Sequence, residues 1–386
     1  MTRSVVIIQK HVPRYRAQFF ERLRRELTTR GVKLRLVYGD PVGTDVQRRD
    51  SRNVAWGEYR RNRILRTGQR PLIWQPVLDA TRDADLVIVE QANKLLVNNV
   101  LLARQYLGRA PVAFWGHGAN LQSQGGAFLS EHAKRLLANL PHWWFAYTEC
   151  CRQRVNSYGF PSERISVVQN AIDTEALRAE CSSVTKDEIQ AFRSHYNLGE
   201  GPIALFIGSL YDEKRLPFLC DAVSLARDQI PTLRLVIAGD GGGRSYLEER
   251  AAAEPWVTLT GSLVDRAKAV ALATSSVFAM PGLVGLAILD AFAAGLPLVT
   301  TNVDYHSPEI EYLEDGVNGV IVRPADDVEQ YARALCDVAT EGRGSVLRAN
   351  ALASAMQFTL PAMVERFSNG VLAALAAQRR CPKVFL

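Results

Sequence analysis

Short apolar runs alternate with longer amphipathic stretches along most of the chain, and this alternation limits the possible folds more than any other feature. The apolar runs of the first half are residues 4–9, 34–39, 84–91, 111–118, 141–148 and 164–173. Segments 16–31 and 94–108, between these runs, have the length and composition of helices. Alternating strands and helices build a parallel sheet that helices cover on both faces. The first half therefore predicts a doubly wound α/β domain.

A second alternation starts near Pro202, after a polar stretch that favours helices. Its expected strands are residues 203–210, 233–241, 257–263, 276–282 and 296–302. Because 386 residues are too many for one typical core, we expect two Rossmann-like domains, 1–180 and 181–361, that face each other across a cleft. A last helix, at about residues 362–380, is expected to pack back on the N-terminal domain.

Positive charge is concentrated in the N-terminal half. Residues 1–180 contain 28 Lys and Arg against 16 Asp and Glu, a net charge of +12, whereas the remainder contains 18 against 24, a net charge of −6. The basic clusters at residues 22–27 and 60–66 fit either solvated helix faces or a surface that attracts anionic lipid head groups or an anionic acceptor. No aromatic-basic motif accompanies them, so nucleic acid is not an expected partner.

The cellular location follows from what the termini and cysteines indicate. The apolar core of the N-terminal segment is too short, and too soon followed by polar residues, for a signal peptide. No apolar run approaches the roughly 20 residues that span a bilayer. The six cysteines form no C-x-x-C pair and are expected to be reduced thiols. We expect a cytoplasmic protein whose basic N-terminal domain makes any peripheral contact with the inner face of the plasma membrane.

Polar residues follow several of the expected strands, and each has a structural and a functional interpretation. Lys214 lies just past a strand end, where an ammonium can pair with a phosphate, although surface Lys-Arg pairs are common. His117 stands between two glycines after a strand, as a structural or a catalytic imidazole. Asp173 is best explained as a helix cap. His306 and Glu309 lie in a loop rich in turn residues, where binding groups tend to occur.

Two turns marked by glycines are candidates to bind a ligand. The turn 239–243 invites a dinucleotide interpretation, but Arg244 breaks the G-x-G-x-x-G pattern and no acidic residue ends the following strand at the expected distance. The turn 281–285 leads from a buried strand into an apolar helix that contains Asp290. A carboxylate inside an apolar helix is costly unless it is hydrogen-bonded, so Asp290 needs a partner or a ligand.

In chain order these segments resemble the family 4 retaining glycosyltransferases, which have the GT-B fold. That family typically shows Gly-Arg-Leu…Glu-Lys-Gly, a Gly-x-Gly turn, Glu-Gly-Phe-Gly-Leu…Leu-Glu-Ala and a Pro-Glu loop, with an Asn-Gly-Val-Asp strand end upstream. The counterparts here are GSLYDEKR (208–215), GDGGG (239–243), GLVGLAILDAF (282–292), SPEI (307–310) and NAID (170–173). The resemblance covers nearly the whole chain and is strongest over residues 203–324.

The resemblance implies a nucleotide-sugar donor that is held mainly by the C-terminal domain. The implied catalytic residues are His117, Lys214 and Glu309. The implied contacts to the donor nucleotide and its diphosphate are Gly208, Ser209, Lys214, Gly241, Ser262, Leu263, Gly285, Leu286 and Asp290. The implied contacts to the donor sugar are His117, Gly282, His306 and Glu309. The acceptor candidates are Arg14, Tyr15 and Arg16, which the start of a surface helix explains equally well.

Within this set the resemblance implies particular roles. Lys214 would neutralise the diphosphate, and the amides of Gly285 and Leu286 would meet it where the helix opens. Asp290 corresponds to the second of the family's paired glutamates, which usually accepts hydrogen bonds from ribose hydroxyls. Backbone near Ser262 and Leu263 would lie by the base.

The chain departs from the family pattern at two positions. The family's phosphate-binding arginine falls at Ser209, where Arg215, Arg244 or a hydroxyl contact are the candidate substitutes. The first of the paired glutamates falls at Gly282, so the chain is expected to belong to a subgroup that lacks this carboxylate.

The function implied is transfer of a hexosyl group from a nucleotide-diphosphate sugar to a saccharide or lipid-linked saccharide acceptor, with retention of configuration, in polysaccharide or glycolipid assembly. Two alternatives keep the fold: a nucleotide-sugar epimerase, and a catalytically silent subunit. No cofactor and no catalytic metal are expected, because the nearest Asp-x-Asp motif, at Asp83, is not at a strand end.

Overall fold

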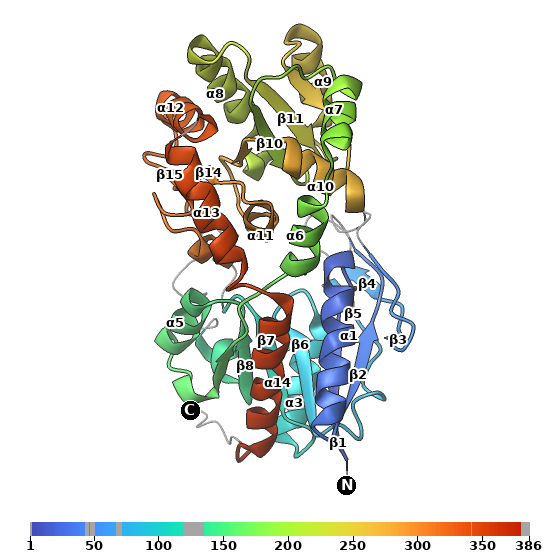
Figure 1. Ribbon diagram of the computed structural model, residues 1–386. Coiled ribbons are helices and arrows are strands. Elements are labelled where there is room, and N and C mark those ends of the chain that lie inside the picture. The colour runs from blue at the N-terminus through green and yellow to red at the C-terminus, as the bar shows by residue number, and fades with distance from the viewer. Residues whose placement is uncertain are drawn as a thin grey trace. The chain divides into compact units, whose positions relative to one another are not determined.

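The computed structural model describes residues 2–42, 46, 51–66, 72–118, 135–340 and 342–379. The chain divides into two compact units, one formed by residues 1–170 and 360–386 and the other by residues 171–359 (Figure 1). Each unit is built on a parallel sheet, as the alternation of apolar runs predicts, so the expected α/β class is confirmed.

The N-terminal unit contains a seven-stranded sheet with the order β3-β2-β1-β6-β7-β8-β9, and all its neighbours are parallel. Its strands are β1 (Arg3–Gln9), β2 (Val32–Tyr38), β3 (Glu58–Tyr59), β6 (Leu86–Glu90), β7 (Val112–Gly116), β8 (Trp143–Ala146) and β9 (Ile165–Val167). Its helices are α1 (Arg14–Thr29), α3 (Leu96–Tyr106), α5 (Glu149–Ser157), the 3-10 turn η1 (Ser162–Arg164) and α14 (Leu360–Ala376). The sequence reading did not assign β3 or the antiparallel pair β4 (Arg63–Arg66) and β5 (Leu72–Trp74).

The last helix, α14, packs beside α1 on this sheet, as expected (Figure 1). Phe367 of α14 lies against Phe19 of α1 and Trp115 of β7, with ring centroids 5.3 and 5.0 Å apart. Phe367 also stacks on Phe145 at 4.3 Å. These rings are fully or almost fully buried, so the C-terminal helix is part of the core of the N-terminal unit.

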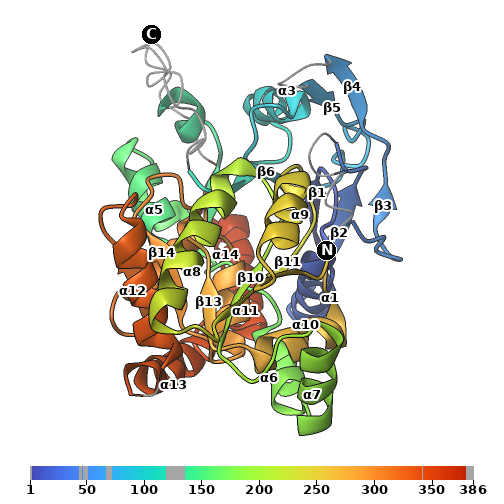
Figure 2. The ribbon, with the colours of Figure 1, turned by 90° about the horizontal axis from the view of Figure 1, so that it is seen from above.

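The C-terminal unit contains a six-stranded parallel sheet with the order β12-β11-β10-β13-β14-β15. Its strands are β10 (Ile203–Ile207), β11 (Arg234–Ala238), β12 (Val257–Leu259), β13 (Val277–Ala279), β14 (Leu298–Thr301) and β15 (Gly319–Val322). Its helices are α6 (Thr174–Ser182), α7 (Lys186–His195), α8 (Leu216–Gln229), α9 (Arg244–Ala253), α10 (Asp265–Thr274), α11 (Ala287–Ala293), α12 (Val328–Ala339) and α13 (Arg343–Ala355), with 3-10 turns η2 (Asp212–Lys214) and η3 (Pro308–Tyr312). Helices α8 and α12 pack side by side (Figure 2).

The strand order of the C-terminal sheet determines where a ligand can bind. From β10 the chain proceeds outward through β11 and β12, and then it crosses to β13 and proceeds in the other direction through β14 and β15. The loops that follow β10 and β13 therefore leave neighbouring strands in opposite directions. Such a reversal of strand order opens a crevice at the carboxyl ends of the strands, where α/β proteins bind ligands. The predicted segments at 208–215 and 280–286 are those two loops.

No helix among the described residues is long and apolar enough to cross a membrane. Their five cysteines are free, and Cys381 lies outside the described residues.

Candidate active site

The two loops at the reversal of strand order are bonded directly to each other. The amide of Leu283, in the turn after β13, donates to the carbonyl of Glu213 at 2.8 Å. In return the ammonium of Lys214 donates to the carbonyl of Leu283 and lies 3.7 Å from the sulfur of Met280. Lys214 is only 5% exposed, so its charge is held inside the unit and aimed at the turn.

This close approach explains why residue 282 is a glycine. A Cβ atom on Gly282 would lie 2.0 Å from the carbonyl oxygen of Glu213 and 2.7 Å from the Cα of Lys214. Both obstacles are backbone atoms, which cannot rotate aside as a side chain can. No side chain is therefore accommodated at residue 282 while the turn packs on the loop that carries Lys214.

His306 and Ser307 hold the other side of the same turn. The amide of Val284 donates to Nδ1 of His306 at 3.0 Å, and Nε2 of His306 donates to the carbonyl of Thr301 at 2.7 Å. The amide of Ser307 donates to the carbonyl of Val284 at 3.0 Å. Burial lowers the pKa of His306, in keeping with a neutral ring whose two nitrogens have opposite roles. The imidazole is thus a support for the turn.

The remaining residues expected near the diphosphate and sugar lie in the turn after β13, on η3 and in the loop after β10. Gly285 ends the turn, and Leu286 caps α11. Glu309 lies on η3, two positions after Ser307, and is 3% exposed. Gly208 and Ser209 follow β10, and the amide of Gly208 donates to the carbonyl of Ala238 at the end of β11.

Gly241 packs against the loop after β10, since a Cβ there would lie 2.7 Å from the carbonyl oxygen of Leu210. The glycine-rich turn therefore allows a close approach of two backbone segments.

Asp290 has a partner that sequence reasoning missed. Its Oδ1 atom lies 2.6 Å from Nζ of Lys268 on α10, and the side chain of Asp290 is 11% exposed. No local sequence pattern predicts this ion pair, because Lys268 and Asp290 lie on different helices and come together only when the chain folds. Ser262 and Leu263, the residues expected near the base, lie in the loop that leads into α10.

The two arginines expected as candidate phosphate cations, Arg215 and Arg244, have other partners. Arg215 donates to Thr301 Oγ1 at 3.0 Å and to the carbonyl of Ala325 at 2.7 Å, and it pairs with Asp326. Arg244, whose side chain is 48% exposed, pairs with Glu248 at 2.7 Å. Arg215 is therefore committed to holding β14 and the segment after β15, whereas the ion pair of Arg244 is of the weak surface kind.

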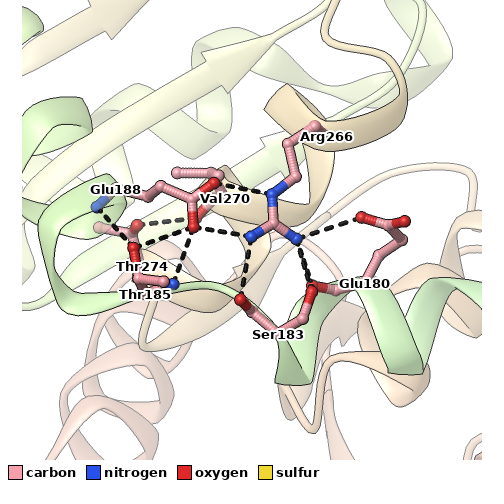
Figure 3. A network of polar contacts seen from close by, with 7 residues as sticks. All are labelled: Glu180, Ser183, Thr185, Glu188, Arg266, Val270 and Thr274. Atoms are coloured by element: carbon pink, nitrogen blue, oxygen red, sulfur yellow. Dashed lines mark hydrogen bonds and ion pairs between the residues drawn. The ribbon is translucent and has the colours of Figure 1, made fainter.

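Arg266 anchors α10 to the corner between α6 and α7 (Figure 3). Its guanidinium pairs with Glu188 at 2.7 Å and Glu180 at 3.1 Å, and it donates to the carbonyl and hydroxyl of Ser183. The bonds from Arg266, followed by the capping bond from the Thr185 amide, lower the pKa of Glu188 to about 2. This network fixes the start of α10, and with it the loop that contains Ser262 and Leu263.

The candidates of the N-terminal unit differ in their surroundings. His117 directly follows β7, and its ring lies edge-on to Tyr147 with centroids 4.6 Å apart. Arg14 and Tyr15 are exposed at the start of α1. Arg16, by contrast, is 4% exposed and donates to Asn170 Oδ1 at 2.5 Å, with its guanidinium 4.7 Å from the ring of Trp115. Its charge is thus engaged inside the unit.

Comparison with known proteins agrees with the fold and with the family that the sequence resembles. Residues 17–176 match the model described as Glycosyltransferase Family 4, and residues 201–341 match the model described as Glycosyl transferases group 1. The two matches together cover more than half of the chain. Both descriptions name glycosyltransferases, and the two parallel α/β units fit the two-domain GT-B architecture. The chain belongs to the family 4 glycosyltransferases.

Named relatives share part of the sequence. The GtfA subunit of the UDP-N-acetylglucosamine–peptide N-acetylglucosaminyltransferase from Streptococcus pneumoniae is 29% identical over 187 residues, which are 45% of this chain and 36% of the relative. O-antigen chain mannosyltransferase B from Escherichia coli is 26% identical over 219 residues, 53% of each chain. The chain thus spans about a third to a half of the length of these relatives.

Solved structures share the fold over nearly the full length. Alr3699/HepE from Anabaena, solved with UDP and glucose, has a TM-score of 0.72 at 15% identity, covering 96% of this chain and 100% of that one. WaaG, described as a glycosyltransferase of lipopolysaccharide biosynthesis, has a TM-score of 0.65 at 15% identity, covering 95% of this chain and 98% of that one.

Proposed function

We propose that this chain transfers a hexosyl group from a nucleoside-diphosphate sugar to a saccharide acceptor, with retention of anomeric configuration. The observation that carries the proposal is the buried ammonium of Lys214, which is directed at the turn 281–285 where the order of the strands reverses. A cation at this place suits a diphosphate leaving group. Because the solved neighbour Alr3699/HepE contains UDP and glucose, a uridine diphosphate sugar is the first donor to test.

The proposed donor site uses the residues that the motif order indicates. Lys214 and the amides of Gly285 and Leu286 meet the diphosphate, with Gly208, Ser209 and Gly241 beside them. Asp290 accepts hydrogen bonds from the ribose, and the backbone of Ser262 and Leu263 borders the base. Glu309 and His117 contact the donor sugar. His306 and Gly282 determine the position of the turn 281–285 beside the sugar. His306 accepts a bond from the amide of Val284, and Gly282 lets the turn pack on the backbone of Glu213.

In the proposed reaction the bond between the sugar and the diphosphate breaks while the acceptor oxygen bonds to the anomeric carbon on the same face. The leaving diphosphate oxygen accepts the proton of the acceptor hydroxyl, so no protein base is required. Lys214 stabilises the negative charge that develops on the diphosphate, and this stabilisation is greater in the transition state than in the ground state.

The acceptor is proposed to be a saccharide of a surface polysaccharide or glycolipid. Arg14 and Tyr15 are the exposed candidates to bind it. The net charge of +12 over residues 1–180 suits an anionic or lipid-linked acceptor and a peripheral position at the inner face of the plasma membrane. The glycine at 282 is proposed to mark a subgroup of the family that lacks the first carboxylate.

A single assay tests the proposal. Purified protein is incubated with uridine, guanosine and adenosine diphosphate sugars, with and without an extract that contains lipid-linked saccharides as acceptors. The release of nucleoside diphosphate is measured. We expect release that depends on the acceptor. Conversion of the nucleotide sugar into an epimer without acceptor would establish the epimerase alternative. A protein that neither binds nor consumes any of the three nucleotide classes would be a catalytically silent subunit.

A further inference from the structure

We propose that Lys268 is a positioning residue for ribose recognition, which holds Asp290 as a hydrogen-bond acceptor for the sugar hydroxyls of the donor nucleotide. This inference rests on the proposed function and adds a residue to its donor site. Lys268 lies on α10 and Asp290 on α11, 22 positions apart in the sequence.

The ion pair occupies one oxygen of the carboxylate. Nζ of Lys268 lies 2.6 Å from Oδ1 of Asp290, and Oδ1 is buried with no other hydrogen bond within the described residues. The side chains of Lys268 and Asp290 are 24% and 11% exposed. Because Oδ1 is buried against the lysine, Oδ2 is the oxygen that remains to accept a bond from a ligand.

The second oxygen has no partner of its own. Among the residues that the structure describes, no hydrogen bond or ion pair reaches Oδ2 of Asp290. Oδ2, unlike Oδ1, is not fully buried, so it is open to a donor from outside the protein. A pair of ribose hydroxyls would supply the missing donors. The half-satisfied carboxylate is thus the independent observation that points to a ligand.

The end of α10 that carries Lys268 is held in place by bonds to neighbouring helices. Two positions earlier on α10, Arg266 is bonded to Glu188, Glu180 and Ser183, so that end of the helix is tied to α6 and α7. Cys181 of α6 lies beside the pair, and burial, followed by the charge of Asp290, raises the pKa of this thiol to about 11. The thiol is therefore neutral near pH 7 and does not compete with Asp290 for the lysine charge.

The test separates ribose recognition from binding of the diphosphate. Uridine, guanosine and adenosine diphosphates are first ranked on wild-type protein by isothermal titration. The strongest is then compared with its 2′,3′-dideoxy analogue, which lacks both hydroxyls. We expect wild-type protein to bind the ribonucleotide at least about tenfold more tightly, the value of a hydrogen bond to a charged group. In Lys268→Met this ratio should fall to about two or less, while affinity for the dideoxy analogue changes less than threefold.

Two further variants distinguish positioning from simple structural support. Lys268→Arg keeps a cation at this position and should restore most of the ratio. Arg250→Met removes the ion pairs to Asp221 and Glu254, which lie away from α10 and Asp290, so it should lower the melting temperature and leave the ratio unchanged.

Three outcomes would overturn the inference. Equal loss of affinity for both nucleotides in Lys268→Met would make the pair a structural ion pair. An unchanged ratio in that variant would show that Asp290 does not depend on Lys268. Wild-type protein that binds none of the three diphosphates would overturn the proposed function, and this inference with it, whereas the first two results leave the proposed function standing.

Discussion

Replacing Gly282 with alanine tests the close approach on which the candidate site is built. The new Cβ would lie 2.0 Å from the carbonyl oxygen of Glu213, whereas ordinary contacts are 3.4–4 Å. The turn must therefore retreat by more than ~1 Å, which breaks the 2.8 Å bond from the amide of Leu283 to that carbonyl. The same movement separates Lys214 from the carbonyl of Leu283.

The magnitude follows from the two bonds. A neutral backbone bond contributes about 0.5–1.5 kcal/mol, and a bond to a charged group about 1.5–3 kcal/mol. Because Lys214 is 5% exposed, water does not replace its lost partner without further rearrangement. We expect Gly282→Ala to lower the free energy of unfolding by about 2–4 kcal/mol and to reduce turnover at least about tenfold, because the ammonium no longer faces the turn.

The assay is urea unfolding followed by circular dichroism, together with the rate of diphosphate release. Gly242→Ala is the matched control: a Cβ there meets no atom within 4 Å, and its stability should remain within about 1 kcal/mol of the wild type. If Gly282→Ala were as stable and as active as Gly242→Ala, the backbone explanation for the glycine at residue 282 would be wrong.

Four other predictions concern the same unit. Lys214→Ala should lower turnover about 10²–10³-fold, the scale of one lost transition-state charge partner, and a change below threefold would remove Lys214 from the site. Asp290→Ala should weaken nucleoside diphosphate binding, measured by calorimetry, by about 1.5–3 kcal/mol; unchanged affinity with lower stability would make Asp290 purely structural. Burial lowers the pKa of His306 in the folded state, so the unfolded state binds the proton more readily, and stability should fall as the pH drops below about 6.5. His306→Gln should lose this part of the pH dependence in unfolding titrations, and a slope equal to the wild type would contradict it. Finally, activity should survive chelation with EDTA, because Lys214 supplies the positive charge that a metal ion provides to the diphosphate in metal-dependent enzymes. Loss of activity that Mg²⁺ or Mn²⁺ restores would refute this expectation.

The architecture could be predicted from the sequence because it depends on local periodicity. Apolar runs and amphipathic stretches report which faces are buried, and their alternation leads to parallel sheets in both units. The helix cap at Asp173 could also be predicted, because capping depends on neighbouring residues. Its side chain accepts a hydrogen bond from the amide of Ala176 at 3.2 Å and caps α6 as expected. The strands β3, β4 and β5 were not predicted because they do not lie in longer apolar runs of the kind that contain the equally short β9 and β13.

The chemistry of the candidate site depended instead on contacts between residues distant in the chain. Gly282 is required by the backbone of Glu213, His306 supports Val284, and Lys268 pairs with Asp290. Arg16, which its position suggested for an acceptor, is directed into the core towards Trp115. None of these partners lies within a helical turn or a strand period of the other. Motif order indicated which residues meet at the reversal of the strands, but the partner of each side chain follows from how loops and helices pack once the sheet has formed.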